Sequence, residues 1–326
     1  MNRRPSVYVT RRIPEAGLQM IRESCDLRLW EGDMPPPREV LEGEVRDSDG
    51  ILCLLTESID AALIAQGERL RVISQLAVGV DNIDLETATA RGIPVGHTPG
   101  VLTEATADMT FALLMSGARR IPEGVDKVRA GRWLTWEPMG LLGADVWGAT
   151  LGIVGLGRIG TAVALRAQGF RMRILYYDVG RSPAKEAELG VEYADLETLL
   201  AEADFVSLHC PLIPATHHLI DEEALQRMKP TAILVNAARG PVVDADALIR
   251  ALREGWIRGA ALDVTDPEPI PADHPLVGLS NCIIVPHIAS ATVTARERMA
   301  TMAAENLLAG LRGERLPYCA NQEVYG

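Results

Sequence analysis

The chain of 326 residues is 48% hydrophobic and 23% charged, a composition typical of a globular protein and not of a disordered one. Its formal net charge of −12 argues against a nucleic-acid or membrane-surface binder, because such proteins usually present a basic face. At roughly 150 residues per domain, the length predicts two domains.

The cysteines and the first residues indicate the compartment. The five cysteines are odd in number and widely spaced, and none forms a CxxC pair, which favours a reducing compartment. The first apolar stretch ends at Arg11 and is too short for a signal peptide, and no run approaches the roughly 18 apolar residues of a membrane span. We therefore expect a cytoplasmic protein.

Short β-rich runs alternate with longer helical patterns, which is typical of α/β folds with parallel strands. The first predicted strands are 6–10, 50–55 and 72–75, and the first predicted helices are 14–24, 37–46 and 60–66. A long helix is predicted at 103–117. The segment 119–147 that follows has no clean period, and it contains three of the five tryptophans, Trp133, Trp136 and Trp147.

A second and stronger series begins at residue 150. Its six predicted strands are 150–154, 173–178, 205–208, 232–236, 259–262 and 283–285. Its predicted helices are 159–168, 183–189, 195–203, 221–228 and 244–254. Asp221 and Asp244 are suited to the N-caps of the last two. The series predicts a doubly wound dinucleotide-binding domain, preceded by a smaller α/β unit that extends to about residue 98.

A glycine-rich turn connects the first strand and helix of this series. The sequence GLGRIG at 155–160 is a GxGxxG motif, and its place between strand and helix predicts a pyrophosphate site at the helix N-terminus. Gly155 permits the tight turn, Gly157 lets the backbone approach the phosphates, and Gly160 lets the helix pack closely.

The residue that follows the next strand bears on cofactor choice. Asp178 lies 23 residues after Gly155, where a carboxylate would accept hydrogen bonds from the ribose hydroxyls. It favours NAD, because it would repel a 2′-phosphate. Arg181 and Ser182 leave NADP possible, should their loop turn back toward the ribose.

Three polar side chains follow three predicted strands of the second series. Arg239 follows strand 232–236, Glu268 follows 259–262, and His287 follows 283–285. Ligands of open α/β sheets bind at the carboxyl ends of the strands. A guanidinium, a carboxylate and an imidazole are therefore expected at one edge of the sheet.

Ordered motifs along essentially the whole chain resemble the D-isomer-specific 2-hydroxyacid dehydrogenases. They share their order and spacing with that family, and they are AVGVDNID at 77–84, TPGVLT at 98–103, the glycine turn, NAARG at 236–240, DPEP at 266–269 and PHIAS at 286–290. Gly131-Arg132-Trp133 with Trp136 is similar to the glyoxylate/hydroxypyruvate reductase branch. One departure is His97, which stands where the family usually has Asn.

The resemblance implies a domain layout and a catalytic triad. It implies a discontinuous, flavodoxin-like substrate-binding domain at 1–98 and 288–326, and a Rossmann NAD(P)-binding domain at 99–287. His287 would be the general acid that protonates the substrate carbonyl as hydride arrives. Glu268 would bind the other ring nitrogen and stabilise the charged imidazole, and Arg239 would hold the substrate carboxylate.

The resemblance also implies the remaining binding residues. Those expected to bind the cofactor are Thr106, Gly155, Gly157, Arg158, Ile159, Gly160, Asp178, Pro211, Thr216, Ala237 and Asp263. Those expected to bind the substrate are Leu54, Val78, Gly79, Arg239 and Ser290. No cluster has metal-ligand spacing, so no metal is expected.

The expected activity is the NAD(P)-dependent reduction of a short 2-oxoacid, glyoxylate or hydroxypyruvate, to the D-2-hydroxyacid. No basic residue lies in the loop at Leu54, which favours a small neutral substrate over 3-phosphohydroxypyruvate. The alternatives are another 2-oxoacid such as 2-ketogluconate, the oxidation of formate, and a non-catalytic NAD(H)-sensing protein.

The tryptophan-rich segment 119–147 predicts a homodimer. Three exposed tryptophans would form an apolar patch that soluble monomers rarely tolerate, and a twofold contact would bury it. By resemblance, Trp136 is the candidate for reaching the substrate cleft of the partner.

Overall fold

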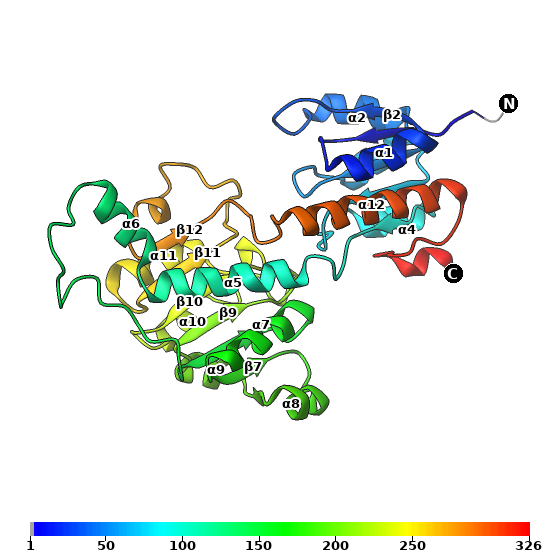
Figure 1. The fold of residues 1–326 in the computed structure, drawn as a ribbon. Helices are drawn as coiled ribbons and strands as arrows, with labels where there is room; N and C mark the ends of the chain where they lie inside the picture. The colour runs from blue at the N-terminus through cyan, green and yellow to red at the C-terminus, as the bar shows by residue number, and fades with distance from the viewer. Residues whose placement is uncertain (1–2) are drawn as a thin grey trace. The chain divides into compact units, whose positions relative to one another are not determined.

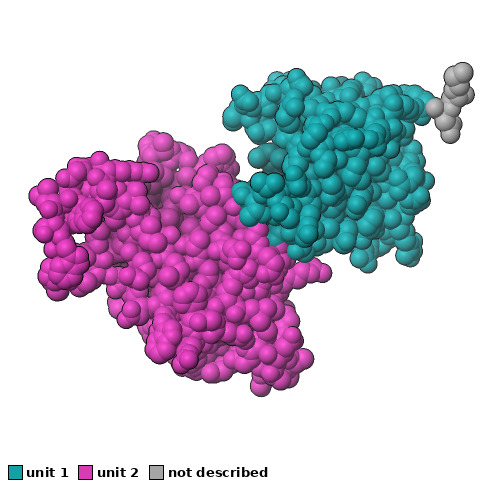
Figure 2. Space-filling view, viewed as in Figure 1, with its two compact units in different colours: residues 1–102, 291–326 teal, residues 103–290 magenta. Residues whose placement is uncertain are grey.

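The computed structural model describes residues 3–326, and the chain forms two compact units (Figure 2). Unit 1 contains the described residues up to Leu102 together with Ala291–Gly326, and unit 2 is Thr103–Ser290. The predicted domain boundaries, at 98/99 and 287/288, lie a few residues before these two breaks.

Unit 1 is built on a five-stranded parallel sheet in the order β2-β1-β3-β4-β5. Its strands are β1 (Ser6–Val9), β2 (Asp26–Leu29), β3 (Gly50–Cys53), β4 (Val72–Gln75) and β5 (Val95–Gly96). Its helices are α1 (Glu15–Ser24), α2 (Arg38–Arg46), α3 (Ala61–Gln66), α4 (Leu85–Ala90) and α12 (Val293–Arg312). The strand order is the flavodoxin-like one, which confirms the predicted fold class for this unit.

The long helix α12 returns to the N-terminal part of the chain (Figure 1). It packs against α1 and against strands β3 and β4, and twelve of its residues are buried. Its N-cap Thr292 accepts a hydrogen bond from the Ala295 N–H, and it ends at Gly313 with φ +75°. Residues 292–312, far apart in sequence from the first strands, therefore belong to the same core.

Unit 2 is built on a seven-stranded parallel sheet in the order β12-β11-β10-β9-β6-β7-β8. Its strands are β6 (Thr150–Val154), β7 (Arg173–Tyr177), β8 (Glu192–Tyr193), β9 (Phe205–Leu208), β10 (Ile233–Asn236), β11 (Gly259–Leu262) and β12 (Cys282–Ile284). Strand order reverses between β6 and β9, as in the doubly wound dinucleotide-binding fold. The predicted Rossmann class is confirmed.

Helices flank the sheet of unit 2, and two of them begin at the aspartate N-caps that the sequence predicts. They are α5 (Thr103–Ala118), α6 (Ile121–Arg129), α7 (Arg158–Gly169), α8 (Pro183–Leu189), α9 (Leu196–Glu202), α10 (Glu222–Arg227) and α11 (Ala245–Glu254). Asp221 and Asp244 accept hydrogen bonds from the N–H groups of Ala224 and Ala247, so both predicted N-caps are confirmed. One apolar core contains α5 and α7, which pack together.

The elements that sequence reasoning missed are short or exposed. They are strands β2, β5 and β8 and helices α4 and α6, so each sheet has more strands than predicted. Both residues of β8 are exposed, and this two-residue strand is too short to show an alternating apolar pattern. Helix α6 has an apolar stripe but no buried residue, and it lies within a segment that has no clean period as a whole.

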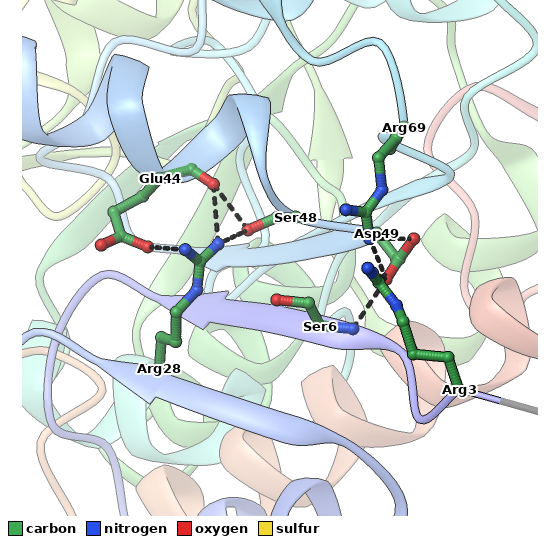
Figure 3. A network of polar contacts seen from close by, with 7 residues as sticks. All are labelled: Arg3, Ser6, Arg28, Glu44, Ser48, Asp49 and Arg69. Atoms are coloured by element: carbon green, nitrogen blue, oxygen red, sulfur yellow. Dashed lines mark hydrogen bonds and ion pairs between the residues drawn. The ribbon is translucent and has the colours of Figure 1, made fainter.

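Several arginines line a groove of unit 1 beside β1 and β2. Figure 3 shows three of them with the carboxylates that they contact. Asp49 accepts hydrogen bonds from the guanidinium groups of Arg3 and Arg69, each at 2.9 Å, and from the Ser6 N–H at 2.7 Å. Arg28 pairs with Glu44 at 2.9 Å. The basic residues shown are thus paired with carboxylates, and these contacts tie strands together.

Among residues 3–326, no helix is long and apolar enough to cross a bilayer.

Candidate active site

The glycine turn after β6 has the backbone geometry that a pyrophosphate site requires. Gly155 has φ +95°, and a Cβ there would lie 2.8 Å from the backbone of Cys210. A Cβ on Gly160 would lie 2.1 Å from the Gly155 carbonyl oxygen. Gly157 is exposed, has open space around it, and is the N-cap of α7. The turn therefore fits a dinucleotide, since its open side presents backbone and a helix N-terminus.

Asp178 follows β7, and one of its carboxylate oxygens accepts a hydrogen bond from the glycine turn. Its Oδ2 accepts a hydrogen bond from the Leu156 N–H and its Oδ1 accepts one from the Val179 N–H, each at 2.8 Å. A carboxylate has about four acceptor positions, so two remain for the ribose hydroxyls.

The cation beyond Asp178 is held on helix α8. Arg181 donates to Glu186 at 2.8 Å, and Glu186 also accepts a hydrogen bond from the Tyr176 hydroxyl at 2.8 Å. That hydroxyl in turn accepts one from the Ser182 N–H at 2.7 Å. The loop of Arg181 and Ser182, which could bind the 2′-phosphate of NADP if it turned back toward the ribose, is thus fixed by hydrogen bonds within this region.

Arg239, Glu268 and His287 follow β10, β11 and β12, which are neighbours in the sheet. Gly240 brings two of their loops together, because a Cβ there would lie 1.9 Å from the Thr265 carbonyl oxygen. The Asn236 side chain fixes the Arg239 loop by donating to the Arg239 carbonyl at 2.9 Å and accepting from the Ala238 N–H at 3.0 Å.

His287 and Glu268 form a close pair. The Nδ1 of His287 lies 2.5 Å from Oε1 of Glu268, so Nδ1 is the donor and Nε2 is the ring nitrogen available for proton transfer. Burial acts to raise the pKa of Glu268, but the hydrogen bond from His287 and the charge of the imidazole outweigh it, and this pKa lies below its ordinary value. The carboxylate therefore stays charged beside the imidazole.

The backbone of His287 adopts a conformation that is rare outside glycine. Its φ is +52°, and its N–H donates to the carbonyl of Asp263 at 2.9 Å and to that of Val285 at 3.0 Å. Such conformations persist where the surrounding structure holds them, and they gather at functional sites.

Asp263, predicted to bind the cofactor, contacts the backbone of the loop that contains His287. The residue is only 1% exposed, and its oxygens accept from the N–H groups of Ile288 at 2.7 Å and Ala289 at 3.0 Å. Burial raises its pKa, while these two hydrogen bonds act in the opposite direction. These contacts position the loop that contains His287, and the residue type of Asp263 alone does not predict this role.

Comparison with known proteins decides the family. Residues 111–289 match the family described as D-isomer specific 2-hydroxyacid dehydrogenase, NAD binding domain. A glyoxylate reductase from Korarchaeum cryptofilum is 57% identical over 322 residues, which cover 98% of this chain and 97% of that protein. The chain belongs to the D-isomer specific 2-hydroxyacid dehydrogenase family. It is accordingly an NAD(P)-dependent oxidoreductase that interconverts 2-oxoacids and 2-hydroxyacids.

Solved structures share the fold over nearly the whole chain. A protein of Thermus thermophilus is 49% identical with a TM-score of 0.92, covering 97% of this chain and 99% of that one. An NADPH-dependent glyoxylate/hydroxypyruvate reductase from Sinorhizobium meliloti, solved with NADP and malonate, is 30% identical with a TM-score of 0.88, covering 98% of each chain.

In unit 1, the loop after β4 presents two of the predicted substrate-binding residues of this dehydrogenase, Val78 and Gly79. Within the described residues, their N–H groups donate to no protein acceptor. Val78 is 36% exposed, so these donors lie near solvent and are suited to an anion.

The loop after β3, which contains Leu54, rests on a buried carboxylate that sequence reasoning missed. Glu57 is 3% exposed and accepts from the Leu54 N–H at 2.7 Å and the Thr10 hydroxyl at 2.6 Å. Asn82, inside the AVGVDNID motif, donates to the carbonyls of Leu54 at 3.0 Å and Glu57 at 2.8 Å. Only the motif signals Asn82, and nothing in the sequence signals Glu57.

The remaining predicted residues differ in exposure. Thr106 and Ser290 are buried, the former within α5, and Ala237 is buried after β10. The Thr216 hydroxyl closes a turn by donating to the Pro211 carbonyl at 2.6 Å. Arg158 is exposed at the start of α7, and Ile159 is half-buried. Their cofactor and substrate contacts remain predictions.

Among the other histidines, His209 is held in its neutral form. Burial lowers its pKa to about 4, and its Nε2 lies 2.8 Å from the Ser207 hydroxyl. His217 and His218 stack with ring centres 4.0 Å apart. Within residues 3–326, no three His, Cys, Asp or Glu side chains gather as metal ligands would.

Proposed function

We propose that this dehydrogenase reduces glyoxylate or hydroxypyruvate to the D-2-hydroxyacid. The observation that carries the proposal is the 2.5 Å pair of His287 and Glu268, in loops that follow strands beside the one that Arg239 follows. NADH, when bound, supplies the hydride. His287 gives its Nε2 proton to the carbonyl oxygen, Glu268 stabilises the charged imidazole, and Arg239 binds the carboxylate.

The substrate class is supported by the loop after β3, which contains no basic side chain that could pair with a phosphate. The Leu54–Glu57 loop holds a buried carboxylate and no basic side chain. We infer that the N–H groups of Val78 and Gly79 receive the substrate carboxylate. The proposal is tested by initial rates with glyoxylate, hydroxypyruvate, pyruvate, 2-ketogluconate and 3-phosphohydroxypyruvate, each with NADH and NADPH. A preference for the phosphorylated or the six-carbon substrate would reject it.

We expect the KM for NADH to be lower than the KM for NADPH. The substitution Asp178→Asn should reduce the difference between the two KM values. Asparagine keeps an acceptor for the turn but removes the charge that would repel a 2′-phosphate, and we expect about a tenfold change in the ratio of kcat/KM values, equivalent to about 1.4 kcal/mol. Steady-state kinetics with both cofactors measure the ratio. The exposed Glu188→Gln on α8 removes one charge nearby and serves as control. A wild-type preference for NADPH would contradict the assignment.

We propose a homodimer built on segment 119–147. Its large apolar side chains are mostly exposed: Trp133 by 64%, Leu134 by 87%, Trp136 by 78%, Met139 by 78% and Trp147 by 65%. On α6, which begins this segment (Figure 1), Ile121, Val125 and Val128 lie at helical spacing and are also exposed. A second copy of the chain would bury this stripe. The reach of Trp136 into the partner's site stays a prediction.

The dimer has a direct test. Sedimentation should give twice the chain mass of 35.3 kDa at micromolar concentration, and Val125→Asp should shift the mass toward the monomer because it places a charge in the apolar contact. Val277→Asp, at a similarly exposed valine outside the segment, is the control. A wild-type monomer would reject the proposal.

We propose a cytoplasmic location. All five cysteines are free. Burial raises the pKa of Cys25 to about 11 and that of Cys282 to about 12, which keeps these thiols protonated. Fractionation of cells that express the protein would test the location.

A further inference from the structure

Three successive carbonyl groups in the loop after β4 each have a donor. The Ala77 oxygen accepts from the Thr98 N–H at 2.8 Å, and the Val78 oxygen lies 2.9 Å from Nδ1 of His97. The Gly79 oxygen accepts from the side-chain amide of Gln75 at 3.3 Å. These residues are therefore held through their acceptors, while the N–H groups of Val78 and Gly79 face no acceptor within residues 3–326.

The planarity of the peptide bond makes these contacts directional. In a trans peptide, the C=O of one residue and the N–H of the next point in opposite directions. The Val78 carbonyl points to the His97 ring, so the Gly79 N–H points away from it. The direction of the Val78 N–H is fixed by the backbone contact between the Ala77 carbonyl and the Thr98 N–H. The direction of the Gly79 N–H is fixed instead by a side chain, because the Val78 carbonyl contacts the His97 ring.

The His97 ring must donate in this contact, because a carbonyl oxygen can only accept. Its Nδ1 therefore carries a hydrogen. Nδ1 is bonded directly to Cγ, as is the amide nitrogen of asparagine. An asparagine, which the family usually has here, would thus place a donor at nearly the same point.

The backbone of His97 is itself anchored. Its N–H donates to the Tyr318 carbonyl at 3.1 Å, and its carbonyl accepts from the amide of Asn306 at 2.9 Å. Asn306 is fully buried on α12, and its oxygen accepts from the Tyr318 N–H at 3.0 Å. The imidazole therefore extends from a fixed point of unit 1.

We propose that His97 is a positioning residue for the substrate carboxylate: it fixes the Val78–Gly79 peptide so that the Gly79 N–H faces the anion. The inference rests on the proposed function, since it takes this N–H to bind the 2-oxoacid. It adds a residue that acts through the backbone and does not itself touch the substrate.

The test compares His97→Ala, His97→Leu and His97→Asn. Loss of one oriented hydrogen bond should raise the KM of the preferred 2-oxoacid about five- to tenfold in the Ala and Leu variants. The kcat and the KM for NADH should change little, because the proton donor and the glycine turn are untouched. The inhibition constant of oxalate, an unreactive carboxylate, should rise by the same factor as the KM.

Rescue and controls separate positioning from folding. His97→Asn should restore the KM to near the wild-type value, and His274→Asn, in a loop of unit 2, should leave it unchanged. Leucine fills the volume of the ring but has no donor, so the Leu variant can still be tested if the Ala variant is destabilised. Thermal unfolding measures the stability of each variant.

An unchanged KM and oxalate constant in the Leu variant, or a loss confined to kcat, would overturn the inference while leaving the proposed function intact. An Asn variant as impaired as Leu would also overturn it. Failure of the wild-type enzyme to reduce any 2-oxoacid would instead reject the proposed function.

Discussion

Replacing His287 with alanine should lower kcat for 2-oxoacid reduction by about a hundredfold to ten-thousandfold, the usual contribution of a positioned general acid. The carbonyl oxygen would lose its proton donor at the moment when negative charge develops on it. Cofactor binding should survive, because the glycine turn at 155–160 and Asp178 lie after other strands, β6 and β7. Steady-state rates and a fluorescence titration with NADH measure the two effects separately.

A second variant guards against a folding artefact. His287 has φ +52°, and alanine is disfavoured there, whereas asparagine tolerates this region. His287→Asn should therefore be as inactive as the alanine variant but closer to the wild type in stability. His274→Asn, which keeps an acceptor for the Leu276 N–H, is the matched control. Near-normal turnover in either His287 variant would remove this residue from the proposed role.

The arrangement of the active-site edge could be predicted because parallel strands impose it. Once 232–236, 259–262 and 283–285 are assigned as strands of one sheet, their following loops must gather at one edge, and the structure has β10, β11 and β12 side by side. The glycine turn could be predicted because GLGRIG stands between a predicted strand and a predicted helix.

Contacts that depend on pairing between distant segments could not be predicted. His97 meets the Val78 carbonyl only because β4 and β5 pair in one register, in which Ile73 opposes Val95. Glu57 is buried because Thr10 and the Leu54 N–H, from different parts of the chain, supply its hydrogen bonds. The residue type alone would place such a carboxylate at the surface.

Asp263 shows the limit of transferring a role from a resemblance. The resemblance implies a cofactor contact for Asp263, and its carboxylate oxygens accept hydrogen bonds from the N–H groups of Ile288 and Ala289. The second lone pairs still allow a bond to the cofactor. The sequence does not predict the turn of the His287 loop, which brings these two N–H groups to the carboxylate.

The substitution Glu268→Gln should lower kcat/KM for reduction by about a hundredfold at neutral pH, because the amide no longer stabilises the charged imidazole that donates the proton. A neutral His287 would keep its hydrogen on Nδ1, facing the side chain at 268, and would have none on Nε2 to give. The alkaline limb of the pH–rate profile should therefore move to lower pH. Glu188→Gln, an exposed change of the same chemistry in the same unit, should leave the profile as it is.

The stability of this pair has a pH dependence of definite sign. The pKa of Glu268 is lower in the folded protein than its ordinary value, so its contribution to stability is fully present above that ordinary value, about 4.3, and is lost as the pH falls through the lowered one. The difference in melting temperature between wild type and Glu268→Gln should therefore shrink as the pH falls below about 4, where the carboxylate takes up a proton. Thermal unfolding across this range measures it. If the difference is flat through the acid window and the alkaline limb of the rate profile does not move, Glu268 does not act on His287 through its charge.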